Sequence, residues 1–217
     1  MTDFVAQIEF LKQHSSYAQR WLNSHPDWVD WLRTRGAQKV DVIGIEDLLS
    51  PCRGALAAPE QDEAQFMTDL RLARQRLMLW IAFRDLNGMA DLSEVTHALS
   101  HFAEAAIALA IAYIREDQQR RFGLPWSQVT DSEMPLMVVG MGKLGGLELN
   151  LSSDIDLIFL YEHEGDTQGG PKSLSYHEWF TRMGKRLIKL LAEHDANGFV
   201  FRVDMRLRPN GDSGPLV

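Results

Sequence analysis

Ser152-Ser-Asp-Ile-Asp-Leu-Ile-Phe-Leu-Tyr161 is the stretch of sequence that decides the fold. Its pattern predicts a strand over 154–161, and side chains of a strand alternate between two faces. Asp154 and Asp156 therefore project from one face, while the apolar residues that alternate with them bury on the other. Two neighbouring carboxylates repel each other, which costs free energy unless a positive group lies between them. In proteins this group is ordinarily a divalent metal ion that binds hard oxygen ligands. Adjacent carboxylates of this kind serve mainly phosphoryl and nucleotidyl transfer.

A second charged stretch, Arg202-Val-Asp-Met-Arg-Leu-Arg-Pro209, predicts another strand over 199–207. Its polar residues share one face, so Asp204 can meet the first two aspartates as a third metal ligand. Arg206 and Arg208 offer guanidinium groups that suit a phosphate. The alternative is a set of surface ion pairs on an exposed sheet face, which contribute little to stability.

A glycine-rich turn, Gly140-Met-Gly-Lys-Leu-Gly-Gly146, directly follows a strand predicted over 136–140. Without side chains in the way, backbone N–H groups can approach a phosphate. The amides in question belong to Gly142, Gly145 and Gly146, and Lys143 adds a positive charge. The alternative is a plain tight turn.

Composition narrows the class of protein. With 217 residues, 45% of them apolar, the chain can bury a sizeable core. Its net charge of -8 argues against binding to a nucleic-acid backbone. The single cysteine, Cys52, cannot form an internal disulfide, and no charged leader followed by an apolar run opens the sequence, so we expect a cytoplasmic protein. The longest uncharged apolar run, 105–114, is shorter than the about 20 residues of a bilayer crossing and predicts a buried helix without membrane contact.

Residues 1–122 carry helical spacing throughout. Breakers over 41–63 predict a connector with at most one short helix. A long amphipathic helix follows over 60–86 and ends at Asn87-Gly88, and Ser93 is the predicted cap of the next helix. The arginines of the 60–86 helix are expected to face mostly away from its apolar stripe: Arg71, Arg74, Arg76 and Arg84.

After Gly123-Leu-Pro125 the pattern changes to three strands and one helix, which opens at Ser175 with a capping sequence. The spacing of the glycine turn and the Asp-x-Asp strand resembles that of the nucleotidyltransferase superfamily, although Lys143 stands where Ser is usual. The resemblance implies an α+β fold, with a helical region at 1–122 and a nucleotidyltransferase-type α/β core at 123–217. Its mixed sheet would contain the Asp-x-Asp strand, and we expect the core to be incomplete, truncated at its C-terminus.

A longer set of motifs is similar to one family, the bifunctional glutamine synthetase adenylyltransferase/adenylyl-removing enzymes. These motifs are Gly142-Lys-Leu-Gly-Gly146, Glu148-Leu-Asn150, Ser153-Asp-Ile-Asp-Leu-Ile-Phe159, Val203-Asp-Met-Arg-Leu-Arg-Pro209 and Gly211-x-x-Gly-Pro-Leu-Val217. Family members carry two copies of the core. The Ser152-Ser-Asp strand, the Thr167-Gln-Gly-Gly170 loop and the Ser213-Gly-Pro-Leu-Val217 ending resemble the N-terminal, adenylyl-removing copy more than the C-terminal, adenylylating one.

The resemblance implies phosphorolysis of adenylyl-tyrosine on glutamine synthetase, which gives ADP and free tyrosine. It implies Mg2+ at three catalytic carboxylates, Asp154, Asp156 and Asp204. It also implies phosphate or nucleotide contacts at Gly142, Lys143, Gly145, Gly146, Ser153, Arg206 and Arg208. The implied partners are adenylylated glutamine synthetase, the PII signalling protein, phosphate and ADP or ATP. Two alternatives stay open: ATP-dependent adenylylation by the same fold, and a noncatalytic regulatory or interaction fragment.

Overall fold

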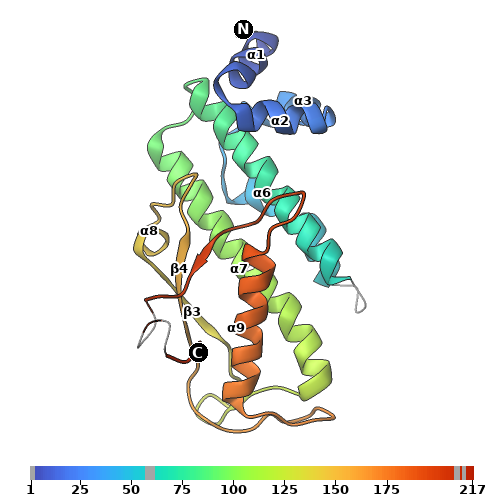
Figure 1. Cartoon of the computed structure of the whole chain (residues 1–217), viewed down its shortest axis with the longest axis vertical. Helices are drawn as coiled ribbons and strands as arrows, with labels where there is room; N and C mark the ends of the chain where they lie inside the picture. The colour runs from blue at the N-terminus through green and yellow to red at the C-terminus, as the bar shows by residue number, and fades with distance from the viewer. Residues whose placement is uncertain (1–2, 57–61, 208–210, 212–213) are drawn as a thin grey trace.

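The chain is described by a computed structural model that covers residues 3–56, 62–207, 211 and 214–217. Its elements confirm the predicted α+β class (Figure 1). The helices are α1 (Phe4–His14), α2 (Ser16–Ser24), α3 (Asp27–Arg35), α4 (Val42–Leu48), α5 (Ser50–Leu56), α6 (Glu63–Leu86), α7 (Leu92–Phe122), α8 (Gly142–Gly145) and α9 (Tyr176–Ala192). The strands are β1 (Trp126–Ser127), β2 (Ser132–Glu133), β3 (Met137–Met141), β4 (Ile155–Leu160) and β5 (Val203–Asp204).

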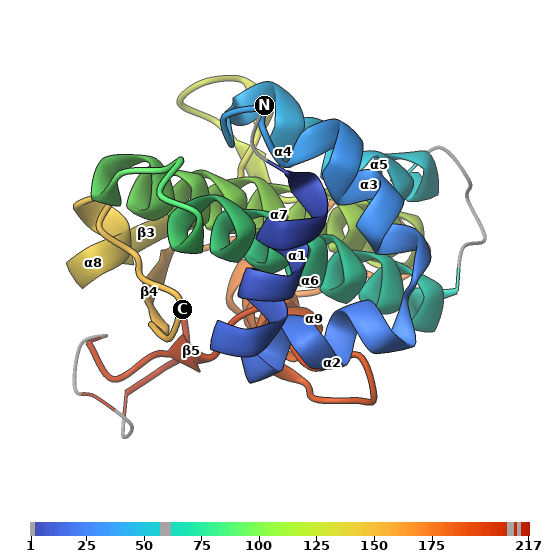
Figure 2. The same cartoon turned by 90° about the horizontal axis from the view of Figure 1, so that it is seen from above.

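The long helices α6 and α7 form the frame of the molecule. Helices α1 to α3 gather at one end of α6, while α9 lies along α7 beside the sheet (Figure 1). Seen from above, α4 and α5 lie on one side of the α6–α7 pair, and α9 and β5 lie on the other (Figure 2). The sheet that carries the aspartates is therefore held against the helical frame through α7 and α9.

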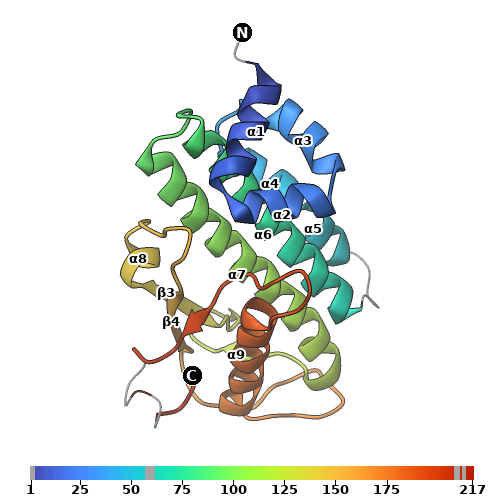
Figure 3. The same cartoon turned by 45° about the horizontal axis from the view of Figure 1, so that its top comes forward.

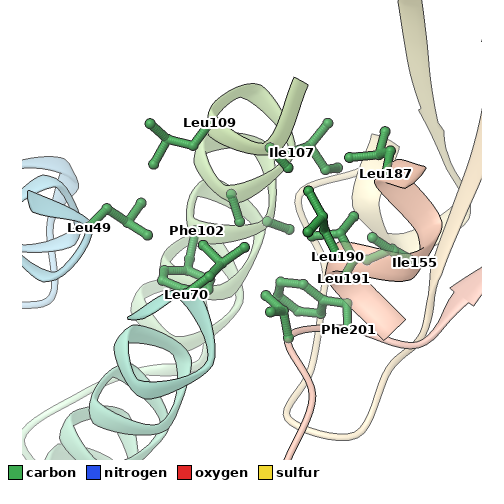
Figure 4. Close-up of a cluster of buried hydrophobic side chains, with 14 of the residues drawn as sticks. Leu49, Leu70, Phe102, Ile107, Leu109, Ile155, Leu187, Leu190, Leu191 and Phe201 are labelled. Carbon is green, nitrogen blue, oxygen red and sulfur yellow. The ribbon is translucent and has the colours of Figure 1, made fainter. Parts of the chain in front are cut away.

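One hydrophobic core joins the helices to the sheet. Leu70 of α6 and Phe102 of α7 are fully buried in the same cluster as Ile155 of β4 and Leu191 of α9 (Figure 4). Burial of such side chains contributes about 1.5–3 kcal/mol each, so this cluster fixes the sheet relative to the helices. The division at 122/123 stays a prediction, and residues from both sides of it share this core.

Two details of the helical region differ from the predictions. The 41–63 segment contains two helices, α4 and α5, instead of at most one. The cap of α7 is Asp91, whose Oδ1 accepts from the Glu94 N–H at 2.8 Å, so the prediction of Ser93 as the cap was wrong. Asp91 has the extended backbone that a capping residue needs, whereas Ser93 already lies inside the first turn.

The arginines of α6 were expected to face away, and three of them are buried instead: Arg71, Arg74 and Arg84. The physical reason is that α6 is covered on nearly every side, by α1, α3, α4, α5 and α7 and by the loop 193–199. Buried arginine needs partners. Arg71 donates to Asp195 at 2.7 Å and to the Glu193 carbonyl at 2.6 Å, which ties this loop to α6.

Helix α7 is long and apolar enough to cross a membrane by length and composition, and more than half of its most apolar stretch is buried inside the molecule. The run at 105–114, predicted as a buried helix, lies in this element and contributes Ala106, Ile107, Leu109 and Ala110 to the core. Helix α7 packs on α4, α5, α6 and α9. These contacts are those of a core helix.

An ion network joins α6, α7 and α9 and yields a pH prediction. Arg186 Nε donates to Glu63 at 2.6 Å, Arg186 Nη1 donates to Asp117 at 2.6 Å, and Lys189 donates to Glu63 at 3.0 Å. Burial alone would raise the pKa of Glu63, but the hydrogen bonds from Lys189 and Arg186 outweigh it and lower that pKa. A lowered carboxyl pKa stabilises the fold above the unfolded value and loses this effect as pH falls through the folded value.

Glu63→Gln should therefore reduce the free energy of unfolding by about 1 kcal/mol near neutral pH, since the network is only partly buried. The difference from wild type should shrink as the pH falls through the lowered pKa of Glu63, because both proteins lack this charge below it. Urea unfolding measured across this pH range checks it. Glu9→Gln, which breaks an exposed pair with Lys12 on α1, is the matched control. A Glu63→Gln difference that persists unchanged in acid would contradict the assignment.

Candidate active site

The Asp-x-Asp strand lies at the centre of a mixed sheet with the order β3-β4-β5. Strand β4 pairs antiparallel with β3, with Met141 opposite Asp156, and parallel with β5, with Asp156 opposite Asp204. Ile155 and Leu157 are fully buried, which confirms the predicted alternation along the strand. Asp154 comes immediately before β4 and is exposed. The predicted strand at 136–140 is also confirmed, shifted by one residue.

The third strand is much shorter than predicted. Only Val203–Asp204 pairs with β4, although 199–207 was expected to be extended along the sheet. The reason is that the N–H groups of Val200 and Phe201 both donate to the Leu191 carbonyl at the end of α9. The chain thus joins the sheet late, and it turns away again at Arg206.

Asp154 and Asp156 carry negative charge that nothing in the described part of the chain neutralises by a hydrogen bond or ion pair. Asp156 is half-buried. Burial raises its pKa, and the nearby charges of Asp154 and Asp204 raise it further, against a smaller lowering effect of Arg206. The carboxylates therefore repel one another within this site, and a bound cation would reduce this repulsion.

Asp204 differs from the other two carboxylates because Arg206 holds it. The Arg206 N–H donates to Asp204 Oδ1 at 2.8 Å, and Nε donates to Oδ2 at 2.8 Å. These hydrogen bonds lower the pKa of Asp204. The sequence pattern indicated Arg206 as a phosphate ligand, and its role there stays a prediction. Arg208 lies outside the described residues.

The carboxylate groups of this site are suitable ligands for Mg2+. Carboxylate oxygens are the ligands that this ion prefers, and burial together with the charges of Asp154 and Asp204 raises the pKa of Asp156. Asp204 has its carboxylate engaged by Arg206. Within the described ranges, no three His, Cys, Asp or Glu side chains are grouped so as to hold a metal ion. The assignment of Asp154, Asp156 and Asp204 as metal ligands stays a prediction.

The glycine-rich turn lies directly against Asp156. Gly142 has φ +54°, and a Cβ there would meet Asp156 Oδ2 at 2.9 Å, so only glycine fits without strain. Residues 142–145 form the single turn α8. The Gly146 N–H donates to the Gly142 carbonyl at 3.1 Å and is thereby engaged within the turn. Contacts of the Gly142 and Gly145 amides with a phosphate stay a prediction.

Lys143 and Ser153, both predicted to contact phosphate or nucleotide, lie close together. Lys143 Nζ donates to Ser153 Oγ at 3.5 Å across the loop that precedes Asp154. Sequence reasoning gave no role to Asn150 and Arg202. Asn150 Oδ1 accepts from Ser153 Oγ at 2.8 Å, and Arg202 Nη2 donates to the Ser152 carbonyl at 2.6 Å. Asn three residues before Ser is a local turn signal that could have indicated the first of these contacts.

The site combines an Asp-x-Asp strand at the centre of a mixed sheet, a glycine turn beside it and a third carboxylate on the next strand. These features are consistent with a nucleotidyltransferase-type α+β domain. The chain belongs to the glutamate-ammonia ligase adenylyltransferase (GlnE) family, whose pattern matches residues 5–217. This confirms the family resemblance seen in the motifs.

Relatives named bifunctional glutamine synthetase adenylyltransferase/adenylyl-removing enzyme occur in several bacteria. The protein of Ralstonia nicotianae is 47% identical over 98% of this chain and 22% of its own length. That of Aromatoleum aromaticum is 46% identical over 94% of this chain and 21% of its own length. That of Nitrosococcus oceani is 50% identical over 71% of this chain and 16% of its own length. The chain thus spans at most 22% of the length of these relatives.

Proposed function

We propose that this chain carries adenylyl-removing chemistry, the phosphorolysis of adenylyl-tyrosine on glutamine synthetase. The observation that carries the proposal is the position of Asp156, between the glycine turn at Gly142 and the paired strand residue Asp204. The names of the relatives suggest the substrate, because they combine adenylyltransferase and adenylyl-removing activities on glutamine synthetase. On this proposal adenylylated glutamine synthetase is the protein substrate, and the PII protein is the regulator.

The reaction is balanced without a redox partner. An oxygen of inorganic phosphate bonds to the α-phosphorus, the bond from that phosphorus to the tyrosine oxygen breaks, and the tyrosine oxygen takes a proton from solvent. The products are ADP and tyrosine. Phosphate is already anionic near neutral pH, so no strong general base is needed.

The residues of the site would contribute to this reaction through their charge and, at Gly142, through the absence of a side chain. Asp154 and Asp156 would hold Mg2+, which when bound offsets the repulsion between the two reacting anions and stabilises the departing oxygen. Gly142 leaves room beside the Asp156 carboxylate, since it has no side chain. Lys143, which is exposed at the edge of the site, is placed to attract a phosphate group. Arg206 contributes a second positive charge next to Asp204.

The reverse direction, ATP-dependent adenylylation, uses the same groups, and the relatives' names include it. The test supplies the chain with Mg2+ and either adenylylated glutamine synthetase plus phosphate, or unmodified glutamine synthetase plus ATP. We expect ADP release that depends on phosphate, and no transfer of AMP from ATP. Transfer from ATP alone would replace the proposal with adenylylation. A folded chain inactive in both assays, yet able to bind glutamine synthetase, would support a noncatalytic fragment.

A further inference from the structure

A cavity lies apart from the aspartates, where α2, α6 and the loop 193–199 meet. Its volume is about 530 Å³, within the range of small-molecule sites. Figure 3 shows the loop between α9 and β5 reaching the side of α6 below α2. Four of its lining residues are basic or can become so: Arg20, His25, Arg74 and His194. None of the described residues that line it is acidic, although the chain as a whole carries a net charge of -8.

Arg74 is the unusual member of this lining. Its side chain is only 7% exposed, and its Nε has no hydrogen-bond partner among the described residues. Burial lowers its pKa, and the only nearby group that raises that pKa is the Tyr17 hydroxyl. Its guanidinium lies 5.3 Å from the ring centre of Phe201. A buried cation without a carboxylate partner is strongly unfavourable, whereas Arg71 and Arg84 on the same helix both have one.

The wall around Arg74 is held by hydrogen bonds from three segments. The Tyr17 hydroxyl of α2 donates to Gln75 Oε1 at 2.5 Å, and Gln75 Nε2 donates to the Asn197 carbonyl at 2.9 Å. Gly198 has φ +86°, and a Cβ there would meet Gln75 Nε2 at 2.9 Å, so the loop can approach α6 only with glycine. The cavity is thus a preformed site and not a gap between loosely placed elements.

We propose that this cavity binds a small organic anion through a carboxylate or phosphate group, with Arg74 and Arg20 as its cationic contacts. Trp21 and Met78 supply the apolar surface for the rest of the ligand. The buried Nδ1 of His25, which also has no partner in the described structure, offers a further polar contact. A bound anion would place a negative charge beside the buried guanidinium of Arg74.

The cavity also touches the segments that lead to the aspartates. Leu151 lines it and directly precedes the Ser152-Ser-Asp stretch, while Phe199 lines it on the way to β5. A ligand there would therefore contact the supports of Asp154 and Asp204 without contacting the aspartates themselves. The inference does not depend on which reaction the aspartates perform.

The test titrates the chain with inorganic phosphate and, separately, with propionate, followed by isothermal calorimetry. Arg20→Ala removes an exposed side chain and leaves the fold intact, and Arg74→Met keeps the buried volume without the charge. Both should weaken binding about tenfold or more, the loss expected of a charge-assisted hydrogen bond. Arg182→Ala, which removes an equal charge from an exposed pair on α9, is the matched control and should bind as wild type does.

The outcomes separate this cavity from the aspartate site. Binding that Arg20→Ala and Arg74→Met both weaken belongs to this cavity, because both side chains line it. Binding of only one of the two anions, with the same dependence on Arg20 and Arg74, would support the site and identify its head group. The proposal is overturned if neither anion binds, or if Arg20→Ala and Arg74→Met both bind like wild type.

Discussion

Asp154→Asn should reduce phosphate-dependent ADP release on the order of a thousandfold, equivalent to ~4 kcal/mol of transition-state stabilisation. The change keeps the size of the side chain and removes one of the carboxylates that would hold Mg2+ in the proposed reaction. Asp156→Asn should have an effect of the same size, and the double variant should lose little more, because the two groups act as one unit. Single-turnover assays at saturating Mg2+ measure the effect. Asp30→Asn, at an exposed pair on α3, is the matched control and should keep full activity.

The same variants should not lose stability, which separates a chemical effect from unfolding. The pKa of Asp156 is raised by burial and by its negative neighbours. Ionised Asp156 therefore disfavours the folded state near neutral pH, and this cost disappears as pH falls through the raised pKa. Asp156→Asn should accordingly raise Tm by about 1–3 °C at neutral pH. If Asp156→Asn kept its activity at saturating Mg2+, the assignment of this carboxylate to the metal would be wrong.

Local pattern was enough to predict the strand that organises the site. Alternation fixed the buried face of β4, and the neighbouring glycine turn was expected from composition alone. The close fit of Gly142 against Asp156 depends on the pairing of β3 with β4, which the sequence suggests only indirectly. Helix α6 shows the limit of such reasoning. The sequence pattern indicates that its arginines form a solvent-exposed face, but the neighbouring helices and the loop 193–199 cover Arg71, Arg74 and Arg84.

The site was predicted incompletely for a related reason. The length of β5 depends on hydrogen bonds from Val200 and Phe201 to the Leu191 carbonyl at the end of α9, which the pattern of the strand itself does not reveal. Arg206 was assigned to phosphate because its own strand placed it near the site, and the strand pattern did not indicate its hydrogen bonds to Asp204. Both features depend on hydrogen bonds that the alternation pattern of a strand does not encode.

The largest stability effect is expected at the buried pair of Arg84 and Glu94. Arg84 Nε donates to Glu94 Oε1 at 2.6 Å, and both side chains are less than a tenth exposed. Arg84 also donates to the carbonyls of Ala37 and Met89, and Glu94 accepts from the Val40 N–H. The pair therefore joins the end of α6, the start of α7 and the segment before α4.

Glu94→Ala should lower the free energy of unfolding by about 3–5 kcal/mol, because it leaves the Arg84 charge buried without a counterion. For a chain of this length that corresponds to a fall in Tm of about 6–20 °C. Arg84→Met/Glu94→Leu should be clearly more stable than Glu94→Ala, since it buries no charge at all. Urea unfolding of the single and double variants measures the coupling, with Glu9→Ala at an exposed pair as control. A Glu94→Ala cost no larger than that of Glu9→Ala would show that the α6–α7 junction does not depend on this pair. The expected large difference would instead make it the contact that sets the frame on which the sheet and its aspartates rest.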